Sequence, residues 1–355
     1  MTYYITKQLL IFEKMLIRAE VVCLKILVSI PEGEIRQSFF PPEVCDQLEA
    51  LGDVVWNTGS VVYTSAQLAQ AIADVDVVFT GWGTPALTQD VIKNARRLRI
   101  MAHTGGSVAG YATPELYAAG VRVLSGNEIY ATSVAEGTIA YMLTALRRLP
   151  YFMDMVKTKG WHSGMWYNEG LLGQTVGIVE FGSVARQLVR LLKPFGVHIK
   201  VCAGHVSQEE ALALGVEKAS IEELFETCHI VTLHGASGPN TYHMINCELL
   251  ERMQQGAIFV NTARGSLVDE AALAMVLTKR PDLQAILDVY EVEPLPTNSP
   301  LRQLPNAYIV PHMAGPTIDR RPLVTMGLIN DIRLIEAGNT PQLEITAQRA
   351  RFMSE

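Results

Sequence analysis

The amino-acid sequence predicts an α/β fold with two doubly wound domains, each built on a parallel sheet. Two stretches of the 355-residue chain alternate short apolar runs with longer segments of helical periodicity. One stretch begins at Lys25 and the other at Thr175, and a long helical segment from Ser133 to about Lys159 separates them. Strands that alternate with helices form βαβ units, and right-handed crossovers between them give a parallel sheet.

In the first stretch, short apolar runs predict strands, and apolar residues at helical spacing predict helices between them. Thr64 or Ser65 is a suitable N-cap for the second of these helices. The expected strands are 26–30, 54–56, 75–80, 98–102 and 121–124, and the expected helices are 42–51, 65–73, 88–95 and 114–119.

The second stretch repeats this alternation. A helix from Asp319 to Glu336 follows it, and this helix could return to the first domain. The expected strands are 176–179, 198–202, 230–233, 257–260, 285–287 and 307–310.

Composition limits the classes of function. Hydrophobic residues make up 49% of the chain and the formal charge is −7, so a basic surface for nucleic acid or anionic membranes is not expected. The five cysteines are scattered without a Cys-x-x-Cys pair, which favours a reducing cytoplasm over a disulfide framework or zinc site. No metal site is predicted. Charged residues interrupt the apolar patches of residues 1–24, so we expect an N-terminal extension there and no membrane span.

A dinucleotide-binding loop is predicted where the strand ending at Val179 meets the next helix. The fingerprint is Gly-x-Gly-x-x-Gly or Ala, and here it reads Glu180-Phe181-Gly182-Ser183-Val184-Ala185. Gly182 and Ala185 match, whereas Glu180 replaces the first glycine. The helix N-terminus would still attract a pyrophosphate, so we expect a phosphate site that is present but reshaped.

A second departure follows the next strand. An acidic residue usually binds the ribose of NAD at this point, but the sequence has Ala203-Gly204-His205. Loss of the acid removes one reason to exclude a 2′-phosphate, and His205 and Ser207 could donate hydrogen bonds to one. We therefore expect either tolerance of NADP or a loosened ribose contact without phosphate preference, and the choice between NAD and NADP stays open.

Three segments in the last third each end an apolar run with a polar residue suited to carbonyl chemistry. Arg264 lies in Asn-Thr-Ala-Arg-Gly, Glu293 in Asp-Val-Tyr-Glu-Val-Glu-Pro, and His312 in Pro-His-Met-Ala-Gly. A guanidinium can bind a carboxylate in a fixed fork. An imidazole titrates near neutrality and can exchange a proton, and a neighbouring carboxylate orients it and raises its pKa. Together they indicate chemistry on the carbonyl group of a substrate that carries a carboxylate.

From Ser220 to Gly315 the chain resembles the D-isomer-specific 2-hydroxyacid dehydrogenases. The matching motifs include Ile230–His234, Asn261–Leu273, Asp288–Val289, Glu293–Pro294 and Pro311–His312, and Ser133–Glu136 is similar to the family signature on the helix that bridges the domains. The likeness extends over about residues 25–340 and is weakest in the first hundred residues.

The resemblance implies a flavodoxin-like substrate domain, residues 25–130 with 319–345, and a Rossmann NAD(P)-binding domain, residues 131–318. It also implies a homodimer with the bridging-helix region in the interface, and a small 2-keto or 2-hydroxy acid as substrate. Arg264, Glu293 and His312 match the catalytic positions.

The cofactor and substrate positions come from the same motifs. Gly106, Ser107 and Val108 match the loop whose amides bind the substrate carboxylate, and Trp82 is a candidate wall for the substrate side chain, with plain core packing as the alternative. The expected cofactor residues are Phe181, Gly182, Ser183, Val184, Ala203, Gly204, His205, His234, Gly235, Thr241, Thr262, Ala263, Asp288 and Gly315.

The competing interpretation is a cofactor sensor or scaffold on the same fold, with weakened or lost dehydrogenase activity. Corepressors of the C-terminal-binding-protein type use the family fold in this way. Glu180 and Ala203 favour this alternative, and the intact set of Arg264, Glu293 and His312 favours the enzyme.

Overall fold

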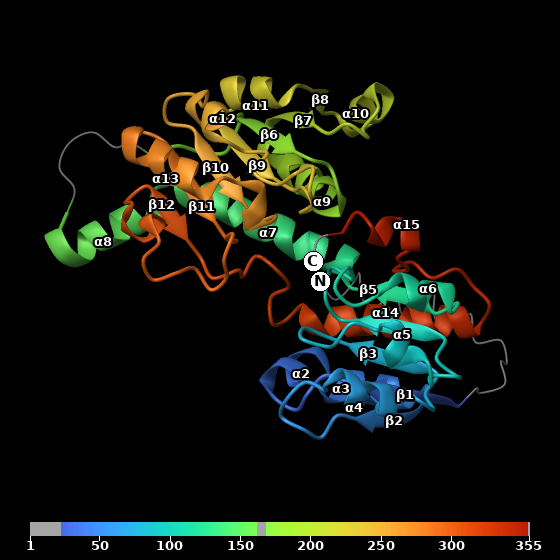
Figure 1. Cartoon of the computed structure of the whole chain (residues 1–355). Helices are drawn as coiled ribbons and strands as arrows, with labels where there is room; N and C mark the ends of the chain where they lie inside the picture. The colour runs from blue at the N-terminus through green and yellow to red at the C-terminus, as the bar shows by residue number, and fades with distance from the viewer. Residues whose placement is uncertain (1–22, 162–167, 354–355) are drawn as a thin grey trace. The chain divides into compact units, whose positions relative to one another are not determined.

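A computed structural model describes residues 23–161 and 168–353. It confirms two α/β domains with parallel sheets of five and seven strands (Figure 1). By its contacts the chain divides into two compact units. Of the described residues, unit 1 contains 23–105, 111–126 and 322–347, and unit 2 contains 106–110, 127–161, 168–321 and 348–353. The N-terminal extension expected at residues 1–24 lies almost wholly outside the described residues.

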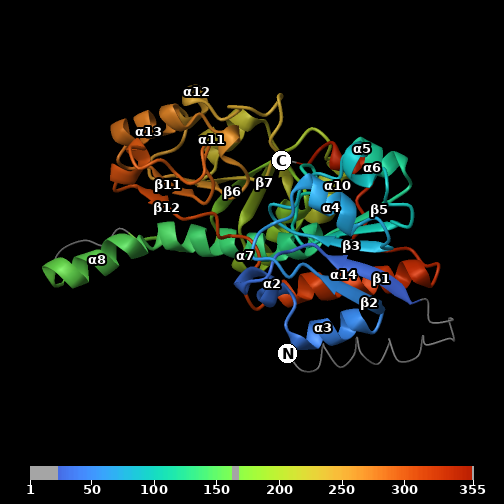
Figure 2. The same cartoon turned by 60° about the horizontal axis from the view of Figure 1, so that its bottom comes forward.

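Unit 1 has the strand order β2-β1-β3-β4-β5, the flavodoxin-like arrangement. Because the crossovers are right-handed, helices α4–α6 lie on the face opposite α3 (Figure 2). The strands are β1 (Leu24–Val28), β2 (Gly52–Trp56), β3 (Val77–Thr80), β4 (Ile100–His103) and β5 (Arg122–Ser125). The helices are α2 (Glu34–Phe39), α3 (Pro42–Glu49), α4 (Ser65–Ala71), α5 (Gln89–Ile92), α6 (Pro114–Ala118) and α14 (Arg321–Glu336).

The C-terminal part of unit 1 returns to its sheet through specific contacts. Arg333 on α14 donates to the backbone and side-chain oxygens of Gln47 on α3, at 3.2 and 2.8 Å. Arg122 on β5 forms a two-point ion pair with Glu344, at 2.8 and 2.6 Å. These bonds join α14 and the segment after it to elements more than two hundred residues earlier.

Unit 2 has the strand order β12-β11-β10-β9-β6-β7-β8, which extends the Rossmann order by one strand. The strands are β6 (Thr175–Val179), β7 (His198–Cys202), β8 (Glu217–Lys218), β9 (Ile230–Leu233), β10 (Ile258–Asn261), β11 (Gln284–Leu287) and β12 (Ala307–Ile309). The helices are α7 (Asn127–Leu146), α8 (Leu149–Lys159), α9 (Ser183–Leu192), α10 (Gln208–Leu214), α11 (Ile221–Thr227), α12 (Cys247–Glu251) and α13 (Glu270–Lys279); α15 (Ala347–Ala350) spans the boundary between the units.

Two hydrophobic cores cover the two faces of this sheet. Side chains alternate between the faces along each strand, so Ile230 and Ile258 pack with α7 and α9, whereas Val231 and Phe259 pack with α11, α12 and α13. Figure 1 shows these helices on the two faces of the sheet. Within the described parts of the chain, every helix is too short or too polar to cross a bilayer.

The long helix predicted from Ser133 to about Lys159 is wrong in one respect, because the structure divides it into α7 and α8. Arg148 takes a left-handed conformation with φ of 49° between them, and Pro150 stands in the first turn of α8. Proline lacks an amide hydrogen and clashes with the preceding turn, so it begins a new helix instead of continuing the old one.

Candidate active site

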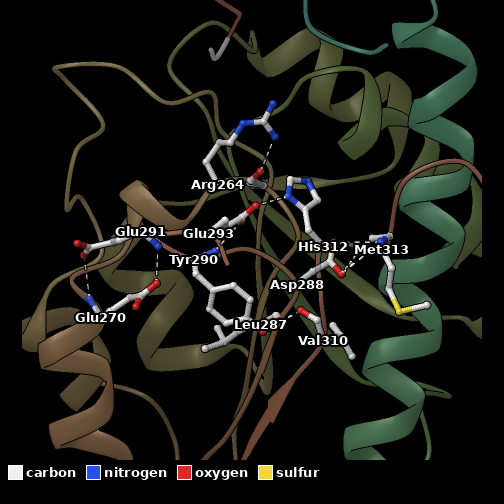
Figure 3. A network of polar contacts seen from close by, with 12 residues as sticks. Arg264, Glu270, Leu287, Asp288, Tyr290, Glu291, Glu293, Val310, His312 and Met313 are labelled. Atoms are coloured by element: carbon white, nitrogen blue, oxygen red, sulfur yellow. Dashed lines mark hydrogen bonds and ion pairs between the residues drawn. The ribbon is translucent and has the colours of Figure 1, made fainter. Parts of the chain in front are cut away.

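Three adjacent strands of unit 2 bring the predicted triad to one edge of its sheet. Strands β10, β11 and β12 are parallel neighbours, and Arg264, Glu293 and His312 follow their carboxyl ends. Figure 3 shows these three side chains close to one another above the strand ends. Ligands of open α/β sheets bind outside the carboxyl ends of the strands, so this edge is the expected place for chemistry.

Glu293 contacts the His312 ring and the backbone of its own loop at the same time. One carboxylate oxygen, Oε2, lies 2.7 Å from Nδ1 of His312, and the other, Oε1, accepts the amide of Tyr290 at 3.0 Å. The two contacts fix the carboxylate, which in turn fixes the ring. The other ring nitrogen, Nε2, is thereby directed away from Glu293 and is the atom suited to exchange a proton with a ligand.

Arg264 lies half-buried beside this pair. Its Nη1 donates to the carbonyl of Ala263 at 2.7 Å, which holds the guanidinium over its own loop. Burial lowers the pKa of Arg264, and the nearby Glu293 carboxylate opposes this effect. Arginine stays protonated in proteins, so the group presents a positive charge in a partly desolvated position, where it attracts a carboxylate strongly.

The residue after Arg264 must be glycine. A Cβ atom on Gly265 would lie only 1.8 Å from the carbonyl carbon of Tyr290, so the two backbones are in direct contact. The hydroxyl of Tyr290 lies 2.9 and 2.8 Å from the carbonyl oxygens of Leu287 and Val310. Burial raises the pKa of Tyr290 to about 12, so it remains a hydrogen-bond donor at neutral pH. These contacts bring the Arg264 and Glu293 loops together.

Asp288 holds the loop that carries His312. Its buried carboxylate accepts the amides of Met313 and Ala314 at 2.8 and 3.0 Å, and the hydroxyl of Tyr141 on α7 donates to it at 2.9 Å. His312 itself has a φ of 47°, a left-handed conformation that is unusual for histidine. That Asp288 lines the cofactor stays a prediction, and in the structure its carboxylate contacts the His312 loop and Tyr141.

A second polar network supports the Glu293 loop from the side of α13. The Glu270 carboxylate accepts the amide of Glu291 at 2.5 Å, and the Glu291 carboxylate accepts the amide of Glu270 at 3.3 Å (Figure 3). His243 lies 2.6 Å from the Glu291 carboxylate. Burial, followed by the charges of Glu291 and Glu293, raises the pKa of Glu270.

The dinucleotide loop has the strand–turn–helix context that the sequence predicts. Helix α9 begins at Ser183, and its N-cap Gly182 provides no side-chain cap. A Cβ on Gly182 would meet nothing within 4 Å, so the space beside this glycine is open. Ala185 is fully buried, as the close packing of this helix requires. Phe181 is also buried, and Val184 lies in the first turn.

The neighbouring loops of unit 2 carry the other expected cofactor residues. Ala203, Gly204 and His205 follow β7, and the His205 ring lies 3.1 Å from the carbonyl of Phe181. His234, Gly235 and Thr241 follow β9, Thr262 and Ala263 follow β10, and Gly315 follows His312 after β12. Burial lowers the pKa of His234 to about 3, so its ring is neutral, and its Nε2 lies 3.1 Å from the Thr232 hydroxyl.

The candidate substrate residues fall into two groups. The loop with Gly106, Ser107 and Val108 belongs by its contacts to unit 2, where a Cβ on Gly106 would lie 3.6 Å from the ring of Tyr130. A Cβ on Gly315 would lie 4.0 Å from the same ring, so Tyr130 stands near both loops. Trp82 belongs to unit 1, is 46% exposed and packs edge-on against Phe39.

Several residues of this site are absent from the sequence-based prediction. Tyr141, Glu270 and His243 act through hydrogen bonds to residues between 21 and 147 positions away. Arg349 is a further example: its guanidinium donates to Glu128 and Ser183 beside the start of α9, at 2.5 and 3.1 Å. No local pattern marks such residues.

Comparison of the sequence with known proteins identifies the family. The model of the D-isomer specific 2-hydroxyacid dehydrogenase NAD-binding domain matches residues 139–314. A D-3-phosphoglycerate dehydrogenase of Methanocaldococcus jannaschii is 33% identical over 294 residues, 82% of this chain and 54% of that protein. A hydroxypyruvate reductase of Thermotoga maritima is 30% identical over 269 residues, 75% of this chain and 86% of that protein.

A solved structure has a similar fold. The TT0316 protein of Thermus thermophilus superimposes with a TM-score of 0.75 at 25% identity, covering 91% of this chain and all of the other. The chain spans about half the length of the phosphoglycerate dehydrogenases that it matches. The reductase relative is covered over most of its length, and the chain belongs to the D-isomer specific 2-hydroxyacid dehydrogenase family.

Proposed function

We propose that this protein catalyses the reversible reduction of a 2-keto acid to a D-2-hydroxy acid with NAD(H) or NADP(H). The observation that carries the proposal is the contact between Glu293 and His312 with Arg264 beside it, at the carboxyl edge of the sheet that holds the dinucleotide loop. Membership of the family supports the reaction type, and a relative is named for the reduction of hydroxypyruvate, a 2-keto acid.

The residues present fit a dinucleotide. Gly182 leaves open space at the start of α9, and the uncapped amides of that helix suit a pyrophosphate. In this proposal Phe181, Ser183 and Val184 contribute the phosphate loop, and the residues after β7, β9 and β10 line the adenosine and nicotinamide parts. The reduced nicotinamide, when bound, supplies the hydride that adds to the carbonyl carbon of the substrate.

Each member of the triad then has a distinct task. Arg264 binds the substrate carboxylate and polarises the adjacent carbonyl through its positive charge. His312 delivers the proton to the carbonyl oxygen from Nε2 as the hydride adds to carbon, and it takes that proton back in the oxidation direction. Glu293 keeps the ring oriented and stabilises its protonated form.

The same proposal assigns the substrate loop and the domain roles. In this proposal the amides of Gly106, Ser107 and Val108 bind the substrate carboxylate, and Trp82 contacts the substrate side chain. Residues 25–130 with 319–345 act as the substrate domain, and residues 131–318 act as the cofactor domain. The Gly106 loop groups with unit 2, which also carries the triad, and lies near Tyr130. This grouping supports the assignment of the loop to the substrate carboxylate.

A turnover assay tests the proposed reaction. Purified protein is mixed with NADH or NADPH and glyoxylate, hydroxypyruvate, pyruvate or a longer 2-keto acid, and cofactor oxidation is followed by absorbance. We expect turnover with at least one substrate, and we expect His312→Ala to lower kcat by about 10²–10⁴-fold while NADH binding is retained. Wild-type turnover in that variant would place the proton donor elsewhere.

One observation favours a second candidate, a cofactor sensor without turnover. Glu180 occupies the first fingerprint position in a left-handed conformation, with φ of 66°, and Ala203 replaces the ribose acid. Tight NADH binding without oxidation by any 2-keto acid would support the sensor. Turnover at rates typical of enzymes would exclude it.

We also propose that the protein assembles as a homodimer through α8 and works in a reducing cytoplasm. Leu149, Met153 and Val156 form an exposed apolar face on α8, and both cartoon views show this helix projecting away from the rest of unit 2 (Figures 1 and 2). An apolar face of this kind suits a second copy of the same helix. The five described cysteines are all unpaired, as expected of a protein in a reducing compartment.

A further inference from the structure

Both departures from the dinucleotide fingerprint lie at the same place in unit 2, and we propose that one compensates for the other. Glu180 supplies the carboxylate that accepts the ribose hydroxyls of the adenosine half, in place of the acid missing at Ala203. The consequence is a preference for NAD(H) over NADP(H). This inference rests on the proposed function, because it requires that a dinucleotide binds at this loop.

The position of Glu180 carries the first step. Strand β6 lies between β7 and β9, and Glu180 directly follows it. On one side its amide donates to the carbonyl of Cys202, the last residue of β7, at 2.8 Å. On the other side its Cγ reaches Gly235, two residues beyond β9. Glu180 therefore stands where the strand order reverses, and dinucleotides bind in the crevice at this switch point.

Gly235 provides the room that the larger residue needs. A Cβ atom on Gly235 would lie 3.1 Å from Cγ of Glu180, closer than ordinary van der Waals contact. The glycine after β9 and the glutamate after β6 are thus complementary in size. Glu180 nevertheless keeps a left-handed backbone, with φ of 66°, and strain of this kind in a non-glycine residue clusters at functional sites.

The polar side chains that follow β7 are positioned by contacts within the protein. His205 lies 3.1 Å from the Phe181 carbonyl, and the Ser207 hydroxyl accepts the amide of Glu210 at 3.0 Å as the cap of α10. Arg186 forms an ion pair with the Glu210 carboxylate at 2.6 Å. A 2′-phosphate would therefore meet a carboxylate at the strand edge and a neighbouring cation that is already paired. Ribose hydroxyls, by contrast, are donors that a carboxylate accepts.

Binding titrations of the full chain test this assignment without relying on turnover. NADH and NADPH are titrated against protein fluorescence, and ADP-ribose and its 2′-phosphate are titrated by calorimetry. We expect the wild type to bind NADH and ADP-ribose about tenfold or more tightly than the 2′-phosphorylated forms. In Glu180→Gln we expect NADH binding to weaken about tenfold and NADPH binding to stay equal or improve, because one negative charge is lost.

Three further variants make the test specific. Glu209→Gln removes an exposed carboxylate on α10 and should leave the preference unchanged. Glu180→Gly with Ala203→Asp restores the usual pattern and should return the NADH preference that Glu180→Gly alone loses. Melting temperatures of all variants check that the fold is retained, and Glu180→Gly should melt higher because the left-handed strain is relieved.

The outcomes separate this inference from the proposed function. Tight NADH binding with the same NADH-to-NADPH ratio in wild type and Glu180→Gln would overturn the role of Glu180 alone. A wild type that prefers NADPH would overturn it as well. A wild type that binds none of the four ligands would overturn the proposed function, and the cofactor preference with it.

Discussion

At the scale of single residues, the site depends on carboxylates that each contact a backbone amide and a second side chain. Glu293 is the clearest case, because one of its oxygens holds the Tyr290 amide and the other holds the His312 ring. Asp288 does the same for the amides of Met313 and Ala314 and for the Tyr141 hydroxyl. Each carboxylate converts a loop into a fixed support, so that the imidazole of His312 is held before any ligand arrives.

Gly265 offers a sharp test of this preorganisation. In Gly265→Ala the new methyl group would overlap the Tyr290 peptide, so the Arg264 and Glu293 loops must separate. We expect the free energy of unfolding to fall by about 3 kcal/mol and turnover to fall further than stability alone explains. Urea denaturation and steady-state kinetics measure the two effects.

Gly110→Ala is the matched control for this substitution. A Cβ on Gly110 meets nothing within 4 Å, and the residue is exposed. Its free energy of unfolding should stay within about 0.5 kcal/mol of the wild type. Equal stabilities for the two alanine variants would mean that the close approach of the loops is not required.

At the scale of elements, the sequence predicts the strands well where they are buried and apolar. The expected strands at 198–202 and 230–233 coincide with β7 and β9. Strand β8 has only two residues, Glu217 and Lys218, and gives no hydrophobic run to detect. The break at Arg148 between α7 and α8 has a local signal in Pro150, which the helical periodicity on both sides outweighs.

In the candidate site, too, the sequence predicts the residues that have a local signal and misses the others. Arg264, Glu293 and His312 could be expected at one edge, because each follows a strand and the strands are parallel. The supports of the triad could not be predicted, since the Tyr141–Asp288 and Gly265–Tyr290 contacts depend on how helices and loops pack in three dimensions. Sequence patterns report local geometry and burial, whereas these contacts are tertiary.

Two histidines at strand ends, buried His103 and half-buried His234, make stability depend on pH. Burial lowers the pKa of His103, the last residue of β4, and of His234, just after β9, to about 3. An unfolded histidine has a pKa of about 6.5, so below that pH the unfolded chain binds more protons than the folded one. Each histidine should therefore cost about 1.4 kcal/mol of stability per pH unit as the pH falls from 6.5 toward 3.

Urea denaturation at pH 7.5 and pH 5.0 measures this loss in the wild type and in His234→Gln. The amide of glutamine can still pair with Thr232 but does not titrate, so we expect the variant to lose less stability on acidification than the wild type. His198→Gln, at an exposed position, should behave like the wild type. The same pH dependence in all three proteins would show that His234 is not a source of acid sensitivity.

At the scale of the whole molecule, the proposed dimerisation through α8 can be tested directly. Met153 and Val156 are 57% and 54% exposed on the same face of this helix, and a second copy would remove that surface from water. We expect light scattering to give about twice the 39.1 kDa of the chain. The double variant Met153→Lys with Val156→Lys should shift the mass to the monomer, because burying two ammonium groups without partners is unfavourable.

The control is Leu212→Lys, at an exposed leucine on α10, and this variant should remain dimeric. A monomeric wild type, or a double variant that stays dimeric, would exclude α8 as the interface.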